Sequence, residues 1–238
     1  MHWYVNDDII TTLFKRNNLS IKDKDYLLPI IKPIYSHKEF QRRLTDEFLH
    51  HSNITLGEHI LEDTISTYKR CKKKKDINME LAIKISMLHD LYTVHWQNNK
   101  ENNKGKFFNK HGFTHPLEAV INSIVWYPEI FIDKNDSKII IDGIIHHMYP
   151  LPVRVFDPNS NSMELNNYGL VKKIDKDSID MIVESTKRGR IGNISISRSK
   201  YKEGRIMSTC DKKVSIKQIK NVSSAKSLIT GNNNSIKK

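Results

Sequence analysis

Histidine is concentrated in segments where its imidazole could bind a metal ion. The chain contains eleven histidines, and most of them fall in four segments: 50–59 (HHSNITLGEH), 87–90 (MLHD), 111–115 (HGFTH) and 144–150 (IIHHMYP). Three of these segments lie on or beside stretches with helical apolar spacing. Each buried imidazole needs its own hydrogen-bond partner, whereas one metal ion can serve several imidazoles at once. The set therefore indicates a buried metal site.

The pair His89-Asp90 places two titratable side chains at the end of an apolar run. Burying either side chain costs free energy unless a partner satisfies it. A hydrogen-bonded His–Asp pair in the core is one explanation, and a metal ion bound by both is the other. The dipeptide alone favours the hydrogen-bonded pair, but the histidines elsewhere in the chain favour the metal ion.

Helices must position these segments, because the apolar residues recur mostly with helical spacing. The strongest pattern covers 78–93, where Ala82, Ile85 and His89 share one face. Thr55 is a predicted N-cap, and Glu58 three residues later completes a capping-box pattern. The predicted helices cover residues 5–17, 36–50, 55–71, 78–93, 116–126, 137–149, 174–187 and 200–218.

Polar and proline-containing segments separate these helices. Residues 27–35 contain two prolines and are predicted to be a connector, while 97–112 and 151–172 are predicted loops. Asp136 or Ser137 is the expected cap of the helix over 137–149. Residues 192–197 could form one short strand, and the chain beyond 221 is expected to be a mobile tail. The fold class is therefore predicted to be all-α.

The composition is that of a globular protein with excess positive charge. The 238 residues are 38% hydrophobic and 28% charged, with a net charge of +12. Seven lysines and no acidic residue follow Asp211, and a second basic run covers 69–75. Such runs can contact phosphates, so nucleic-acid binding is an alternative role, although they are more often solvated surfaces.

Several classes of protein are disfavoured by what the sequence lacks. The two cysteines, Cys71 and Cys210, imply neither a disulfide framework nor a zinc knuckle, and we expect buried thiols in a reducing compartment. The N-terminus lacks a basic secretory region, and no apolar run is long enough to span a membrane. No phosphate-binding glycine motif or GxSxG pattern is present. We therefore expect a soluble, cytoplasmic protein without membrane contact.

The order of the motifs resembles that of a known enzyme superfamily. The segments GEHILEDT, ISMLHDLYTVHW, HGFTHPLEAVINS, IIHHMYPLP and RIMSTCDKK follow one another between about residues 45 and 218. This set resembles the HD-domain metal-dependent phosphohydrolase superfamily, and in particular a bacterial group with the motifs H, HD, HGFTHP, HMxPL and a late D. The resemblance implies a helical HD-domain bundle around a metal site. It divides the chain into an N-terminal helical extension (1–44), the HD-type domain (45–220) and a basic flexible tail (221–238).

The resemblance also implies a set of metal ligands. The positions that match the ligands of a single-metal site are His59, His89, Asp90 and Asp211. Those that match the added histidines of two-metal members are His115, His147 and the adjacent His146. In such members the HD aspartate bridges both ions. His50 and His51 lie upstream of the first matched ligand.

The late aspartate has an alternative interpretation. Asp211 is followed by Lys212 and Lys213, so it could be a surface carboxylate. In that case Asp142 or Asp157 would be the acid to test.

Two of the matched positions, and three basic residues outside the matched set, are candidates for contact with a substrate. The predicted catalytic residues are Asp90, His115 and Arg154. Arg154, Lys104 and Lys106 could each contact a phosphate. His95 stands where related sequences often have an acid.

A shell of histidine and aspartate suits one or two divalent ions among Mn, Fe, Ni, Mg and Zn. Such an ion lowers the pKa of a bound water and so generates hydroxide near neutral pH. The resemblance, with this metal chemistry, implies hydrolysis of a phosphomonoester or phosphodiester, in a nucleotide or another small phosphorylated metabolite. The alternatives are a nucleic-acid-binding protein and a ligand-sensing protein, each on a degenerate HD fold.

Overall fold

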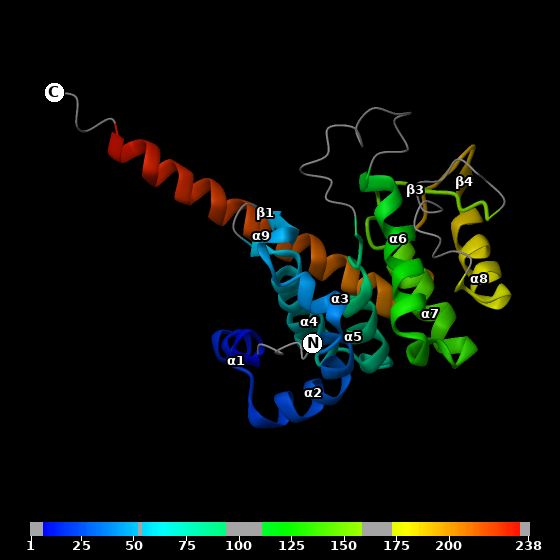
Figure 1. Ribbon diagram of the computed structural model, residues 1–238, viewed down its shortest axis with the longest axis horizontal. Coiled ribbons are helices and arrows are strands. Elements are labelled where there is room, and N and C mark those ends of the chain that lie inside the picture. Colours follow the sequence, from blue (N-terminus) through cyan, green and yellow to red (C-terminus); the bar gives the residue numbers. More distant parts are fainter. Residues whose placement is uncertain (1–6, 52–53, 94–110, 159–172, 234–238) are drawn as a thin grey trace.

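The protein is mostly helical, as the all-α prediction required (Figure 1). A computed structural model describes residues 7–51, 54–93, 111–158 and 173–233. In these residues the strands form only a two-stranded sheet and a three-stranded sheet. Within the same part of the chain, every helix is too short or too polar to cross a lipid bilayer.

Four helices form the centre of the molecule. They are α4 (Leu56–Cys71), α5 (Met79–Leu88), α7 (Lys134–Ile145) and α9 (Lys202–Asn233). The apolar helix α5 packs against the other three, and α9 also contacts α4 and α7. A Cβ atom added at Gly204 would lie 2.6 Å from the Cα atom of Gly143, so the backbones of α7 and α9 touch directly. This close approach brings the C-terminal end of α7 against the first turns of α9.

Shorter elements surround this centre. The remaining helices are α1 (Asp7–Arg16), α2 (Ile21–Tyr35), α3 (Lys38–Arg42), α6 (His111–Trp126) and α8 (Lys176–Lys187), with 3₁₀ turns η1 (Asp46–Phe48) and η4 (Pro128–Phe131). The strands are β1 (Leu49–His51), β2 (Ile54–Thr55), β3 (Val153–Arg154), β4 (Arg190–Ile191) and β5 (Ile194–Ser195). They pair antiparallel, in the orders β1-β2 and β3-β5-β4. Helices α6 and α8 both pack on α7.

The predicted start of α4 is confirmed. Thr55 caps the helix, and its side chain and that of Glu58 form the reciprocal hydrogen bonds of a capping box. The prediction that 27–35 is a connector is wrong, because α2 continues through Pro29 and Pro33. The two prolines are four residues apart and lie on the exposed face, while residues such as Leu27 and Ile31 are buried on the opposite side. Burial of that apolar face outweighs the loss of two helix hydrogen bonds.

Other predicted boundaries also moved. The helix expected over 36–50 is broken into α3, η1 and β1. Helix α7 begins three residues before the predicted start, because Asp133, rather than Asp136 or Ser137, accepts hydrogen bonds from the first backbone amides. The strand predicted over 192–197 is present as β5, but it is shorter.

Helix α9 extends well beyond its predicted end at 218. It continues to Asn233 and projects away from the other helices (Figure 1). Its sequence contains neither glycine nor proline between Gly204 and Gly231, so no residue terminates it. The predicted end of this helix at 218 is therefore wrong, while the flexible character of the tail and the domain boundary at 220 stay predictions.

An ionic cluster around the buried Asp23 side chain joins α2 to α4. One oxygen of Asp23 accepts hydrogen bonds from the Ser20 amide (2.9 Å) and hydroxyl (2.7 Å), and so caps α2. The other oxygen accepts from Lys72 Nζ (2.5 Å) and the Tyr68 hydroxyl (2.6 Å) of the α4 end. Lys72, Tyr68 and Ser20 together hold the pKa of the Asp23 carboxyl well below its usual range.

We expect Asp23→Asn to lower the free energy of unfolding by about 2 kcal/mol at pH 7, since it removes charged hydrogen bonds. A carboxyl with a lowered pKa in the folded state stabilises that state above its unfolded pKa, near pH 4, and loses this contribution as the pH falls further. The difference between variant and wild type should therefore shrink below about pH 4 in urea unfolding. Asp25→Asn, an exposed carboxylate on the same helix, is the control. An equal loss of unfolding free energy in both variants, or a loss that does not change with pH, would contradict the stabilising role of the Asp23 carboxylate.

Candidate metal centre

The structure brings six of the predicted ligands together in one buried cluster. They are His59 (α4), His89 and Asp90 (after α5), His115 (α6), His147 (after α7) and Asp211 (α9). All six are at most 6% exposed. Residues separated by up to about 150 positions thus meet where the central helices converge with α6. The cluster is hereafter called the His/Asp centre.

Asp90 lies between two sets of histidines. Its Oδ2 atom is 3.8 Å from His59 Nε2 and 3.6 Å from His89 Nε2. Its Oδ1 atom is 3.5 Å from both His115 Nε2 and His147 Nε2. Each carboxylate oxygen therefore faces a different pair of imidazoles, which is the arrangement required of a bridging carboxylate.

Asp211 completes the first of these sets. Its Oδ1 atom is 3.4 Å from His59 Nε2 and 3.9 Å from His89 Nε2. Because Asp211 is 6% exposed, its interpretation as a surface carboxylate is wrong. His59, His89 and Asp211 form one group with ligand atoms close enough to hold a metal ion, and Asp90, His115 and His147 form another.

The other nitrogen of each imidazole determines the tautomer. His89 Nδ1 lies 2.7 Å from the Ser86 carbonyl oxygen, and His147 Nδ1 lies 2.7 Å from the Ile144 carbonyl oxygen. His115 Nδ1 lies 3.1 Å from the His111 carbonyl oxygen. A carbonyl only accepts, so each Nδ1 carries the proton. The neutral ring then presents a lone pair on Nε2 to the His/Asp centre.

His59 is held by a glutamine that the sequence did not single out. Its Nδ1 lies 3.0 Å from Gln218 Oε1, and Gln218 Nε2 donates to Glu62 (3.0 Å). Donation to a carboxylate orients the amide, so Oε1 accepts the His59 proton. Gln218 is only 2% exposed and lies on α9 two turns after Asp211. Its burial and partner are tertiary features that helical spacing alone does not reveal.

Buried polar side chains fix the backbone that follows Asp90. Asn122 donates to the Leu91 carbonyl (2.6 Å), and Arg43 donates to the Tyr92 carbonyl (2.5 Å). Glu118, four residues before Asn122 on α6, accepts from the Thr93 amide (2.6 Å). These bonds replace helical ones, which explains why α5 ends at Leu88 instead of continuing to 93 as predicted.

Arg43 is itself an unusual core residue. Its guanidinium is fully buried and lies 4.8 Å from the ring centres of both Phe48 and Trp126. Burial lowers the pKa of Arg43, and Glu39 opposes that shift. The side chain therefore contributes both a hydrogen bond and packing to the position of the HD segment.

Burial acts on the centre in two ways: it opposes the charge of Asp90, and it favours the neutral forms of His115 and His147. Burial alone raises the pKa of Asp90, but the charges that His89, His115 and His147 carry when protonated outweigh burial and hold that pKa well below its usual range. Burial lowers the pKa of His147 to about 3 and also lowers that of His115. His59 differs, since the hydrogen bond to Asp211 outweighs burial and raises its pKa.

Asp63 is a further carboxyl group beside the centre. It lies four residues after His59, is fully buried and accepts a hydrogen bond from Ser86 (2.7 Å). Burial, followed by the charge of Asp211, raises its pKa well above the usual value. The shift favours a protonated carboxyl, which adds no further negative charge to the centre.

The structure does not bring every predicted site residue to the centre. The His146 ring lies near Asp142 (Nε2–Oδ1 3.8 Å), because consecutive residues at a helix end point in directions about 100° apart. Arg154 lies in β3, whose backbone pairs with β5. The positions His95, Lys104 and Lys106 lie outside the described residues.

His50 is closer to the centre than the sequence indicated. Its ring stacks on that of His59 with centroids 4.2 Å apart, and it forms a third possible ligand group with His59 and Asp90. The signal was its position nine residues before His59, at the start of the same histidine-rich segment. The side chain of His51 lies outside the described part of the structure.

The residues present fit a divalent metal ion. Among the described residues, the buried atoms His89 Nε2 and Asp90 Oδ1 have no hydrogen-bond partner. Such atoms are costly in a core unless a cation binds them. The groups contain imidazole and carboxylate donors and no thiolate, a set suited to hard or borderline divalent ions.

Fold and site together define an all-α protein with a buried His/Asp centre that could hold a metal ion. No family model matches the chain, and neither does any of the curated proteins or solved structures compared with it.

Loss of a residue that only orients a metal ligand typically reduces metal affinity by roughly 10–100-fold. Asp90→Asn should reduce metal affinity by more than this, because it removes a charge that faces both sets of imidazoles. Metal content after dialysis and titration with Mn²⁺ or Zn²⁺ measure the loss. Asp157→Asn, at an exposed carboxylate, is the matched control and should bind as wild type does. Full metal occupancy in a folded Asp90→Asn protein would refute the assignment.

Gln218→Leu should weaken metal binding by about 10-fold, because His59 loses the acceptor that fixes its tautomer. Gln218→Glu restores an acceptor and should bind more tightly than the leucine variant. Circular dichroism shows whether each variant folds, and the metal titration gives the affinity. Equal affinities in the wild type and Gln218→Leu would exclude the positioning role.

Proposed function

We propose that this protein is a metal-dependent phosphohydrolase of the HD-domain superfamily, acting on a nucleotide or another small phosphorylated metabolite. The observation that carries the proposal is the position of Asp90. Its two oxygens each lie 3.5–3.8 Å from a separate pair of Nε2 atoms. A single carboxylate placed in this way can bridge two divalent ions.

The composition of the cluster supports the enzyme over the alternatives. Six of the seven residues that the resemblance assigns as ligands are those that meet in the His/Asp centre. They come from distant segments and share no structural task, such as capping a helix, that would bring them together. A degenerate fold that only binds nucleic acid or senses a ligand does not require the whole set, because well-packed apolar residues would cost less to bury.

Exposure indicates the side from which a substrate reaches the centre. The side chains of Asp90, His115 and Asp211 are 7–9% exposed, whereas those of His59, His89 and His147 are 0–1% exposed. We therefore propose that a phosphate group contacts the centre on the side of these three residues.

The chain's own residues would divide the work of hydrolysis. When bound, a divalent ion supplies Lewis-acid chemistry and lowers the pKa of water. Asp90 and Asp211 provide the negative charge that holds it, and His115 is neutral near pH 7 because burial lowers its pKa. A neutral His115 can ligate or accept a proton. Arg154 belongs to β3, which packs against the helix that carries His115, so it remains the proposed phosphate contact.

The proposal is tested by phosphate release from a panel of nucleotides and phosphomonoesters. The metal-free protein is reloaded separately with Mn, Fe, Ni, Mg or Zn, and at least one metal should support turnover that EDTA abolishes. Asp90→Asn and His147→Ala should lower kcat by about 100-fold or more, and Asp157→Asn should leave it unchanged. Turnover that survives EDTA or both centre variants would refute metal-dependent hydrolysis. Tight metal binding without turnover of any substrate would favour the ligand-sensing alternative.

A further inference from the structure

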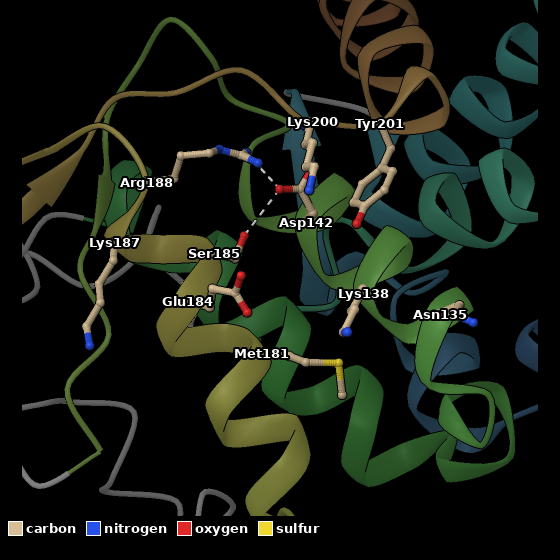
Figure 2. A pocket seen from close by; sticks show the side chains of 10 residues that line it. All are labelled: Asn135, Lys138, Asp142, Met181, Glu184, Ser185, Lys187, Arg188, Lys200 and Tyr201. Carbon is tan, nitrogen blue, oxygen red and sulfur yellow. Dashed lines mark hydrogen bonds and ion pairs between the residues drawn. The ribbon is translucent and has the colours of Figure 1, made fainter.

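A polar cavity lies between α7 and α8, apart from the His/Asp centre (Figure 2). Its volume is about 590 Å³, within the range of small-molecule sites. Helices α7 and α8 form its walls, and Lys200 and Tyr201 close it just before α9 begins. None of the six residues of the centre lines it.

The floor of this cavity is built around a buried carboxylate. Asp142 is 4% exposed, and its Oδ1 atom binds the Arg188 guanidinium at 2.7 Å. Its Oδ2 atom accepts from the Ser199 hydroxyl (2.7 Å) and the Lys200 amide (2.8 Å). Figure 2 shows Asp142 between Arg188 and Ser185, with dashed lines to both. Asp142 therefore fixes both the end of α8 and the segment before α9.

The rest of the lining carries more cationic than acidic side chains. Lys138, Lys187 and Lys200 line the cavity, and Glu184 is the one other carboxylate in its lining. Within the described part of the chain, none of these three lysines forms an ion pair. Since Arg188 already neutralises Asp142, the cavity carries an excess of positive charge that a bound anion would balance. Lysine ammonium groups act as point charges toward phosphate.

We propose that this cavity is a second binding site, which takes a phosphorylated small molecule. The lysines contact its phosphates, while Met181 and Tyr201 supply apolar surface for the rest of the ligand. The proposal goes beyond the function of the His/Asp centre and does not depend on it, because binding needs neither a metal ion nor hydrolysis.

The cavity is also connected to the centre through the end of α7. The Ser185 hydroxyl lies 3.4 Å from Asp142 Oδ1 and 3.3 Å from His146 Nε2. His147, the next residue, faces Asp90 in the centre. A ligand in the cavity would thus contact the same helix end that positions one of the predicted metal ligands.

Binding of ADP to the metal-free protein in EDTA, measured by titration calorimetry, tests the site. The wild type should bind one ADP per chain, and Lys138→Gln/Lys200→Gln should bind it at least 10-fold more weakly. The control is Lys134→Gln/Lys176→Gln, which removes the same charge from exposed positions of α7 and α8 outside the cavity. Its affinity for ADP should be within 2-fold of that of the wild type.

Asp90 does not line the cavity, so the Asp90→Asn protein should still bind one ADP per chain in EDTA. Absence of ADP binding to the wild type, equal loss of affinity in both lysine pairs, or loss of ADP binding in Asp90→Asn would each overturn the proposal. None of these outcomes bears on metal-dependent turnover, so this inference and the proposed phosphohydrolase activity can fail separately.

Discussion

The structure depends on how the buried charge of Asp90 is compensated. A carboxylate in a core needs a positive charge or several hydrogen-bond donors. The imidazoles of His89, His115 and His147 cannot donate to it when neutral, because their Nδ1 protons are committed to backbone carbonyls. In addition, the Nε2 atoms of His115 and His147 lie only 3.1 Å apart, so their lone pairs would face each other. A cation between these groups resolves both problems, which is the physical reason to regard the cluster as a metal centre.

Much of the fold serves to hold this arrangement. The contact between Gly143 and Gly204 sets α7 directly against α9, which aligns the segments that carry His147 and Asp211. Arg43, Glu118 and Asn122 bind the backbone after Asp90 and so stop α5 at the position where the carboxylate faces inward. These polar side chains lie in the core without being predicted ligands, and each satisfies a backbone group that a longer helix would have satisfied itself. Loss of helical hydrogen bonds near Asp90 is therefore offset locally.

The sequence predicted the members of the centre better than the elements around it. His59 and His89 lie on strong helical stripes, so their inward direction follows from spacing. The order of the motifs predicts Asp211 as a ligand, but the lysines that follow it suggest an exposed position. Only the packing of α9 shows that its carboxylate is buried. His146 could not be separated from His147, because its direction depends on the geometry of the last turn of α7. Gln218, Arg43 and the continuous α2 depend on tertiary packing, which neither propensity nor spacing encodes.

His146 and His147 are adjacent in the sequence but belong to different polar networks. One ring joins the network of Asp142, Ser185 and Ser197, and the other faces Asp90, so the same helix end belongs to two buried polar networks. The Asp142 network is satisfied by protein groups alone, since Arg188, Ser199 and the Lys200 amide bind both oxygens. The network around Asp90 is not satisfied by protein groups alone, because the carboxylate and the imidazole Nε2 atoms that face it are all acceptors and too few donors lie among them. Binding of a cation there would then contribute to the stability of the folded state as well as to chemistry. The network around Asp142 would keep the end of α7 in place when no cation is bound, so that His147 is already directed at Asp90 when one arrives.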